Sequence, residues 1–386
     1  MKPAAMALAG LLFYAVLTLS VEERWAWSAF QIGIFALAGW RAMQPYGFRV
    51  PAALAPLALA TAWPHIQLAL GTSFCRGETW NAALNWGTFF LVFALAGEIL
   101  SESGTRRWFL GAISLFGMLL AAVSTLQKYS SGGRVFWIFP SGFKDDVLGP
   151  FVNRNQYAAW VELLLPVALY LAVTDRRLRP LFGSAAAVMF GSVIASASRA
   201  GFVLVCGEVV AVMVTLAAHR SAPRKALALA AIQFVALVFI AVAVAGWQGL
   251  LIRLEAGQPE IVRVDALRAS GLMLRDRPWV GSGLGTWSRM YPRYESFDTG
   301  VVVNQAHNDW AQWAAEGGLP FVLLLAIFAL LLCKPAVQSI YGVGTVAFLL
   351  HALVDYPMQQ RPAVAAWFFA VAGATLAWQR GRNRNV

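Results

Sequence analysis

Two arginines and one histidine are the residues of this sequence whose types could do chemistry together. Arg263 and His307 lie in a polar stretch, residues 248–318, and Arg199 lies in a short polar break between two apolar runs. A guanidinium group binds phosphate oxygens through two parallel hydrogen bonds, and a histidine exchanges a proton near neutral pH. These residue types predict a site that binds a phosphorylated molecule and moves a proton.

Each of these residues also has a structural interpretation. His307 precedes Asn308, near which a helix is expected to begin, so the histidine could merely cap that helix. Arg199 could extend its charged head from a helix end to the membrane surface; a guanidinium held deep in the membrane would cost about 2.5–3.5 kcal/mol and would need an anionic partner. Arg268 is a second candidate phosphate ligand beside Arg263, and the sequence leaves the choice between them open.

Other polar features support narrower expectations. The segment Gly281-Ser282-Gly283-Leu284-Gly285 resembles a nucleotide-binding loop, but no strand precedes it, so we interpret its glycines as allowing a close turn at the membrane surface. Asp145 and Asp146 have no third ligand at a regular spacing, so we predict no metal site. The three cysteines form no CxxC pair and predict no disulfide.

Four acidic residues fall inside apolar runs, where a buried charge is costly and marks a candidate functional position. Because they are scattered over four predicted helices, we expect them to pair with arginines. They are Glu98, Glu162, Glu208 and Asp355.

The elements that must position these residues are membrane helices. Hydrophobic residues make up 59% of the chain and charged residues 13%, and the mean hydropathy is +0.62. This composition is typical of polytopic membrane proteins, and the 16 tryptophans agree with it because indole rings collect at bilayer interfaces. The first apolar run is expected to be an uncleaved helix, since no small-residue cleavage site follows it.

A membrane-spanning helix needs about 20 apolar residues. On this basis the sequence predicts twelve helices, at residues 3–20, 25–41, 50–70, 82–100, 108–126, 156–173, 181–198, 201–218, 226–247, 319–333, 338–356 and 362–379. The run 181–218 would extend about 57 Å as a single helix, far more than the roughly 30 Å hydrocarbon core. The chain is therefore expected to reverse at the polar break 196–201.

The positive-inside rule predicts the orientation. With the N-terminus inside, the inner segments hold fifteen lysines and arginines and the short outer loops hold four. Both termini are then expected in the cytoplasm and residues 248–318 outside. We predict a single integral membrane domain, residues 1–386, whose outer loop 248–318 carries the active site.

Five segments resemble a known family. They are GPFVNRNQYA, SASRAG, RDRPWVGSGLGTW, AHNDWAQWAAEGG and HALVDYP, and the resemblance spans the chain from about residue 140 to the C-terminus. In this order they resemble the O-antigen ligase and O-antigen polymerase superfamily.

The resemblance implies a fold and an activity. The fold is an all-α polytopic membrane protein, a glycosyltransferase of the multi-spanning type, with a long periplasmic loop between helices nine and ten. The activity is metal-independent, inverting transfer of a glycan from an undecaprenyl-diphosphate carrier to an acceptor hydroxyl, on lipid A core or on a polysaccharide chain. It takes place at the periplasmic face of the bacterial inner membrane, among membrane lipids, without cofactor or nucleic acid.

A ligase is our first expectation and a polymerase of O-antigen or exopolysaccharide is the alternative. A flippase for lipid-linked oligosaccharides is a rival of another class; it would be expected to show repeat-related halves with broken helices, and the sequence shows neither.

The resemblance also implies roles for individual residues. The arginine after the small-residue turn is Arg199, the arginine fifteen positions before Pro278 is Arg263, and the histidine of the H-N-D segment is His307; these three are the expected catalytic residues. Position 267 is Leu where the family commonly has Trp, which leaves Arg268 as an alternative to Arg263. The expected substrate-binding residues are Arg24, Asn153, Asn155, Arg268, Asn308 and His351.

Overall fold

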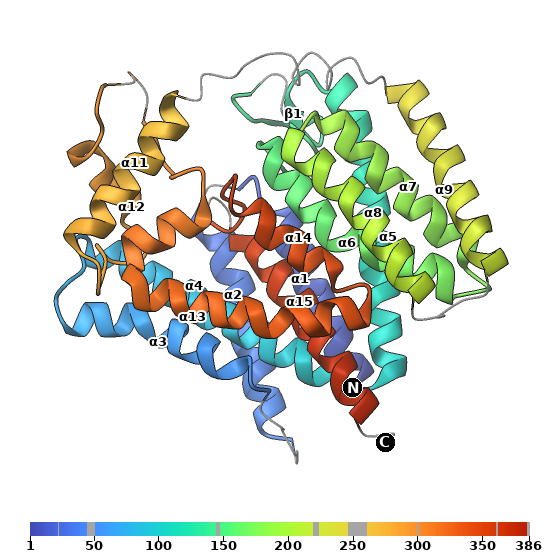
Figure 1. Ribbon diagram of the computed structural model, residues 1–386, viewed down its shortest axis with the longest axis horizontal. Helices are drawn as coiled ribbons and strands as arrows, with labels where there is room; N and C mark the ends of the chain where they lie inside the picture. The colour runs from blue at the N-terminus through green and yellow to red at the C-terminus, as the bar shows by residue number, and fades with distance from the viewer. Residues whose placement is uncertain are drawn as a thin grey trace.

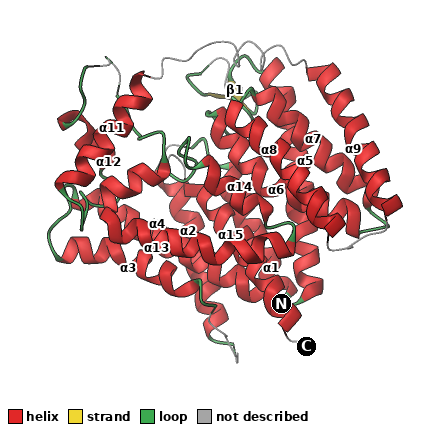
Figure 2. Ribbon diagram, in the orientation of Figure 1, coloured by secondary structure: helices red, strands yellow, loops and turns green. Residues whose placement is uncertain are grey.

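The computed structural model describes residues 1–386 except 22, 45–50, 144–146, 219–223, 246–260, 299, 301, 360–361 and 384–386. The described chain is almost entirely α-helical (Figure 2). Its only strands, within those residues, are the short antiparallel pair β1 (Arg134–Val135) and β2 (Phe139–Pro140).

The helices are distributed along the whole chain (Figure 1). They are α1 (Lys2–Leu17), α2 (Arg24–Ala42), α3 (Leu54–Ala69), α4 (Arg76–Ile99), α5 (Ser103–Ser130), α6 (Arg154–Thr174), α7 (Arg179–Ser196), α8 (Arg199–Ala218), α9 (Arg224–Ala245), α11 (Ile261–Asp276), α12 (Trp287–Met290), the 3-10 helix η1 (Tyr291–Arg293), α13 (Asp309–Ser339), α14 (Val343–His351) and α15 (Pro362–Asn383).

Seven of the described helices are long and apolar enough to cross a membrane, and the protein is an all-α polytopic membrane protein. These helices are α4, α5, α6, α7, α8, α13 and α15. Each of the twelve predicted helices overlaps a described helix, but twelve spans are not confirmed. Helices α1 and α3 have 16 residues each, and α14 has 9 where a span over 338–356 was expected. Helix α14 is short because the chain turns after His351 and again before Val343.

The predicted break between the seventh and eighth helices is confirmed. Helix α7 ends at Ser196, and Ala197 adopts a left-handed conformation with φ 56°. The Ser198 hydroxyl then accepts a hydrogen bond from the backbone N–H of Gly201 at 3.2 Å and so caps the start of α8. A Cβ at Gly201 would lie 2.4 Å from the Cβ of Ala158, so glycine lets α8 approach α6 closely.

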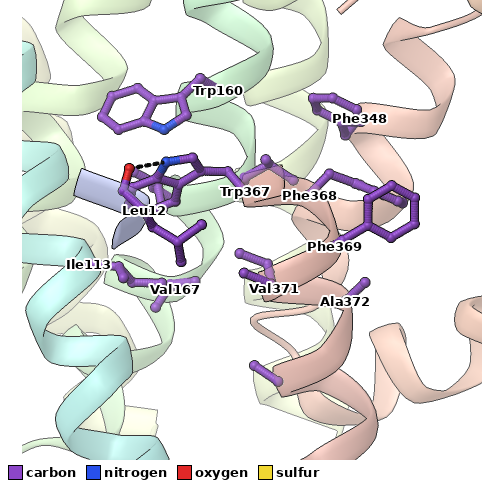
Figure 3. Packing of buried hydrophobic residues seen from close by; sticks show 14 of the residues in the cluster. Leu12, Ile113, Trp160, Val167, Phe348, Trp367, Phe368, Phe369, Val371 and Ala372 are labelled. Atoms are coloured by element: carbon purple, nitrogen blue, oxygen red, sulfur yellow. Dashed lines mark hydrogen bonds between the residues drawn. The ribbon is translucent and has the colours of Figure 1, made fainter. Parts of the chain in front are cut away.

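Helices α6 and α15 form the centre of the bundle. Trp160 of α6 and Trp367 of α15 are fully buried, and the Trp367 indole N–H donates to the carbonyl of Leu12 at 3.0 Å (Figure 3). Within its most apolar window α6 is 89% buried, whereas α8 and α13 are each 33% buried. The exposed apolar side chains of those two helices provide the surface that membrane lipid can cover.

The polar stretch 248–318 is more ordered than a loop over the part that the structure describes. Helix α11 packs on α12 and η1 around the buried rings of Trp287 and Tyr291. Helix α13 begins at Asp309, ten residues before the expected start, but Gly318 has non-helical backbone angles and divides it into two segments. The expected start at residue 319 therefore corresponds to this kink. Figure 1 shows α11 and α12 at one side, away from α7 and α9, while both termini lie in the lower part of the view.

Candidate functional site

Asp355 is the centre of the candidate site. It follows α14, and its carboxylate is 5% exposed. One oxygen, Oδ2, accepts a hydrogen bond from the Asn155 side chain and lies 3.8 Å from Nη2 of Arg263. The other oxygen accepts the backbone N–H of Tyr356 at 2.8 Å. One carboxylate thus joins the start of α6, the turn after α14 and helix α11.

The start of α6 is held to two other motifs. Asn153, and not Asn155, caps this helix, because its side-chain oxygen accepts the N–H groups of Asn155 and Gln156 at 2.8 and 3.3 Å. Asn155 is then free to use its side chain elsewhere: its oxygen accepts the Ser198 hydroxyl at 2.8 Å, while its N–H group reaches Asp355. Asn155 therefore does not cap the helix, and the break between α7 and α8 is tied directly to the site.

His307 lies beside this cluster. Its ring contacts the ring of Tyr356 edge-on at a centroid distance of 4.7 Å, and Tyr356 accepts a hydrogen bond from Asn153 at 3.3 Å. Its backbone has φ 55°, and its buried Nδ1 has no hydrogen-bond partner in the described part of the chain. Burial lowers the pKa of His307; Asp355 acts in the opposite direction and Arg263 adds to the lowering. His307 is therefore neutral near pH 7, as a proton acceptor must be.

The helix-cap interpretation of His307 is wrong. Asn308 caps α13, since its side-chain oxygen accepts the N–H of Ala311 at 2.9 Å and its side-chain N–H donates to the carbonyl of Leu353 at 2.6 Å. The predicted substrate-binding residue Asn308 is thus engaged in the protein's own structure.

Arg199 is the first residue of α8 and follows Ser198, which contacts Asn155. Its side chain is half-buried and makes no hydrogen bond or ion pair with any described residue. A half-buried guanidinium with unused donors, on the residue that follows Ser198, is suited to bind an anion.

The side chains of three expected substrate-binding residues are engaged with other partners. Arg268 pairs with Asp265 at 3.3 Å and donates to the carbonyl of Tyr294 at 3.2 Å. Arg24 donates to the side-chain oxygen of Asn81 on α4. His351 is fully buried, with Nδ1 2.7 Å from Glu162 Oε1. Of the two arginines that the sequence left open, the structure brings Arg263 to the site.

The charge of Arg268 balances the carboxylate of Asp265. Burial would raise the pKa of Asp265, but hydrogen bonds from Ser296 and Tyr291 and the charge of Arg268 hold it below its ordinary value. The Asp265 carboxylate therefore stays charged and organises the α11–η1 unit, with Arg268 as its counter-ion.

The expectation that the buried acids pair with arginines holds for two of the four. Glu98 pairs with Arg41, and Asp355 lies near Arg263. Glu162 pairs with a histidine instead, and Glu208 has no hydrogen-bond partner within the described residues. Apolar periodicity could not distinguish these cases, because the partners lie on other helices.

The glycine-rich segment encloses a carboxylate of the protein itself. Glu316 accepts the backbone N–H groups of Gly285 and Trp287, each at 2.9 Å. A Cβ at Gly281 would lie 2.1 Å from the carbonyl oxygen of Glu316, so the close turn is made against α13.

The prediction that Asp145 and Asp146 form no metal site falls outside the described residues. Among those described, no group of three potential His, Cys, Asp or Glu ligands comes together.

Sequence reasoning missed the central position of Asp355 and the contributions of Ser198 and Tyr356. The available signal was an aspartate interrupting an apolar run, within HALVDYP, and a serine in SASRAG. The predicted site within residues 248–318 therefore also draws on α6, on the α7–α8 break and on the turn after α14.

The fold and site describe a polytopic membrane protein with a polar cluster built on helix ends, and one segment of the chain matches a known family. Residues 184–326 match the family model described as O-antigen ligase, a segment that contains Arg199, Arg263 and His307. This match supports the resemblance of the chain to the O-antigen ligase and polymerase superfamily. No curated protein matches it.

Proposed function

We propose that this protein transfers a glycan from an undecaprenyl-diphosphate carrier to an acceptor hydroxyl, as an O-antigen ligase. The observation that carries the proposal is the convergence on Asp355 of residues from separate motifs. Asn155 and Arg263 contact this carboxylate, Ser198 contacts Asn155, and His307 packs on the adjacent Tyr356. Together with the family match, it supports a single site for a phosphorylated donor and a proton acceptor.

Each role follows from the chemistry of glycosyl transfer. The acceptor oxygen attacks the anomeric carbon, the bond from that carbon to the diphosphate breaks, and undecaprenyl diphosphate leaves. His307 takes the hydroxyl proton, and one such base contributes typically 10²–10⁴-fold. Arg199 and Arg263 stabilise the charge that develops on the departing phosphate. Attack from the face opposite the diphosphate inverts the anomeric configuration.

Asp355 is proposed to orient the site without entering the reaction. It lies close enough to Arg263 to direct the guanidinium, yet at 3.8 Å it leaves room for a phosphate to compete for the same N–H groups. Its hydrogen bond from Asn155 holds the carboxylate in place while the substrate exchanges.

The test of this proposal is His307→Ala in full-length protein purified from membranes. Single-turnover transfer from a defined undecaprenyl-diphosphate glycan should fall by roughly 10²-fold or more, while binding of the carrier is largely kept. Near-wild-type transfer by the folded variant would contradict the base assignment. Lost binding with spared turnover would instead make His307 a carrier ligand.

The reaction is proposed to need neither metal nor cofactor, because the diphosphate is already a good leaving group and two arginines supply the positive charge. Transfer by purified protein should persist in excess EDTA. Activity that disappears and returns with Mg²⁺ or Mn²⁺ would contradict this part of the proposal.

The acceptor is proposed to be lipid A core, and a growing polysaccharide chain is the alternative. A glycan profile of a deletion strain separates the two. Loss of a ligase should leave finished polymer on the carrier, whereas loss of a polymerase should leave single-repeat products. The site is proposed to face the periplasm of the inner membrane. Asp298→Cys should then react with an impermeant reagent in intact cells, and Asn383→Cys should not.

A further inference from the structure

A groove of polar side chains runs beside the candidate site. Two cavities of about 230 and 170 Å³ adjoin, since both are lined by Asn81 and Asn85 of α4 and by Pro362. The first reaches the start of α2, and the second reaches Gln305 and the first segment of α13. We call the two together the amide groove.

Most charged groups of the amide groove are already partnered within the protein. Glu316 is held by the backbone N–H groups described above, and Glu78 lies 3.3 Å from Arg289. At the outer end, Arg24 donates to Asn81 and adjoins Glu23, which carries the opposite charge. The groove therefore offers little net charge to a phosphate, unlike the cluster around Arg199 and Arg263.

The hydrogen-bonding capacity that remains belongs to neutral side chains. Ser288, Asn304 and Gln359 line the groove, and their side chains make no hydrogen bond with a described residue. Asn85 uses its oxygen to accept the Trp27 indole N–H at 2.8 Å, so its amide N–H₂ is left. Amide and hydroxyl groups that can both donate and accept match the hydroxyl groups of a sugar ring.

Aromatic rings complete the lining. Trp86 and Trp313 both line the inner cavity, in edge contact at a centroid distance of 6.3 Å. An indole provides an apolar surface for the C–H face of a sugar while neighbouring amides bind its hydroxyls.

The groove ends at the chain segment that leads to the proposed base. Gln312, at its inner end, donates to Gln305 at 2.7 Å and accepts the backbone N–H of Ala306 at 3.0 Å. His307 is the next residue. A glycan lying in the groove would thus place its end at the segment that carries the histidine.

We propose that the amide groove binds neutral sugar units of one of the two glycan substrates. The inference rests on the proposed function and adds to it a location and a chemical class: uncharged hexose or related rings, held by amides and indoles, at the side of His307. Such rings occur in the donor glycan and in the acceptor glycan, and the experiment distinguishes these sources.

The experiment compares Asn304→Ala and Gln359→Ala with the matched control Gln338→Ala, which lies in α13 away from the groove. The probes are two free oligosaccharides, released by mild acid from the lipid-linked donor and from lipid A core. Binding to full-length protein in nanodiscs is measured for each. We expect each groove variant to weaken the binding of one oligosaccharide by roughly 5–30-fold, which corresponds to the loss of one or two hydrogen bonds. Binding of the other oligosaccharide, and binding of both by the control variant, should be unchanged.

Transfer kinetics provide the second measurement. The KM of the affected glycan should rise with kcat nearly kept, and Ser288→Trp, which fills the groove, should have a larger effect in the same direction. Wild-type binding of both oligosaccharides by all three groove variants would overturn the inference, and so would equal weakening by Gln338→Ala. Binding is also measured in His307→Ala: if that variant transfers normally while the groove variants lose an oligosaccharide, the base assignment fails and the groove stands.

Discussion

The site around Asp355 and the loop around Glu316 both place a carboxylate among hydrogen-bond donors, but they use those donors differently. Glu316 is 1% exposed, and its carboxylate accepts hydrogen bonds from two backbone N–H groups and from the side-chain amide of Gln312. Around Asp355, Arg263 stands 3.8 Å away and the buried Nδ1 of His307 has no partner among the described residues.

The difference separates a structural carboxylate from one placed for a ligand. Backbone N–H groups cannot exchange partners without unfolding the loop, so the Glu316 contacts fix the glycine-rich segment against α13. A long ion pair and an unsatisfied ring nitrogen are costly to bury unless a ligand completes them. The Glu316 loop therefore holds the segment that leads to His307, and the Asp355 cluster is the part of the molecule proposed to do the chemistry.

The largest expected effect tests the structural half of this comparison. Gly281→Ala should destabilise the protein and abolish transfer, because its Cβ would lie 2.1 Å from the Glu316 carbonyl oxygen. Gly71→Ala is the matched control: φ is 66° there and 65° at Gly281, but no atom lies within 4 Å of its Cβ. Its cost should be only about 1–2 kcal/mol, from the left-handed backbone alone. Thermal unfolding in detergent measures both, and equal effects would contradict the tight loop.

The next largest effect is expected at the site around Asp355. Arg263→Lys keeps the charge but loses the planar fork, so transfer should fall by roughly 10-fold or more, with weaker binding of the carrier. Arg268→Lys should leave transfer within about 2- to 3-fold of wild type, because Arg268 pairs with Asp265 away from the site. The reverse order would assign the diphosphate to Arg268.

Helix geometry explains why the sequence could not choose between these arginines. Five residues on an α-helix differ in direction by roughly 140°, so only one of the two can face Asp355. Which one it is depends on how α11 packs against α12, η1 and α13, and this tertiary information is absent from the spacing of the two residues.

The same reason separates what was predictable from what was not. Apolar runs predicted the helices because membrane spans need length and apolarity, and the break at Ser196–Ser198 followed from length alone. The predicted length of α14 was wrong, since apolar residues continue on both sides of this helix while the backbone turns. The contact of Asn155 with Asp355 joins residues 200 positions apart, and no local pattern encodes it.

A smaller effect separates helix capping from substrate binding at Asn308. Asn308→Ala should cost about 0.5–2 kcal/mol of stability through loss of the cap on α13. Asn308→Ser keeps a cap oxygen and should restore most of that stability and, with it, transfer. If Asn308→Ser is stable yet still defective in carrier or acceptor binding, the Asn308 amide contacts substrate after all.

The smallest effect is a change in pH dependence, and it connects Asp355, Arg263 and His307. If His307 is the base, transfer needs its neutral form, so kcat/KM should fall as pH drops through the pKa of His307, which burial holds below its ordinary value. Asp355 raises that pKa, and Asp355→Asn should therefore move the acidic limb to lower pH. Arg263 lowers it, and Arg263→Gln should move the limb to higher pH.

Each shift should be roughly 1 pH unit or less, because the charges act across a partly solvated site. Both variants should lose activity at neutral pH, so the loss itself is uninformative and only the direction of the limb tests the idea. Opposite shifts are expected from charges of opposite sign acting on one titrating ring. Parallel shifts, or none, would show that the acidic limb belongs to another group and would separate His307 from the Asp355 cluster.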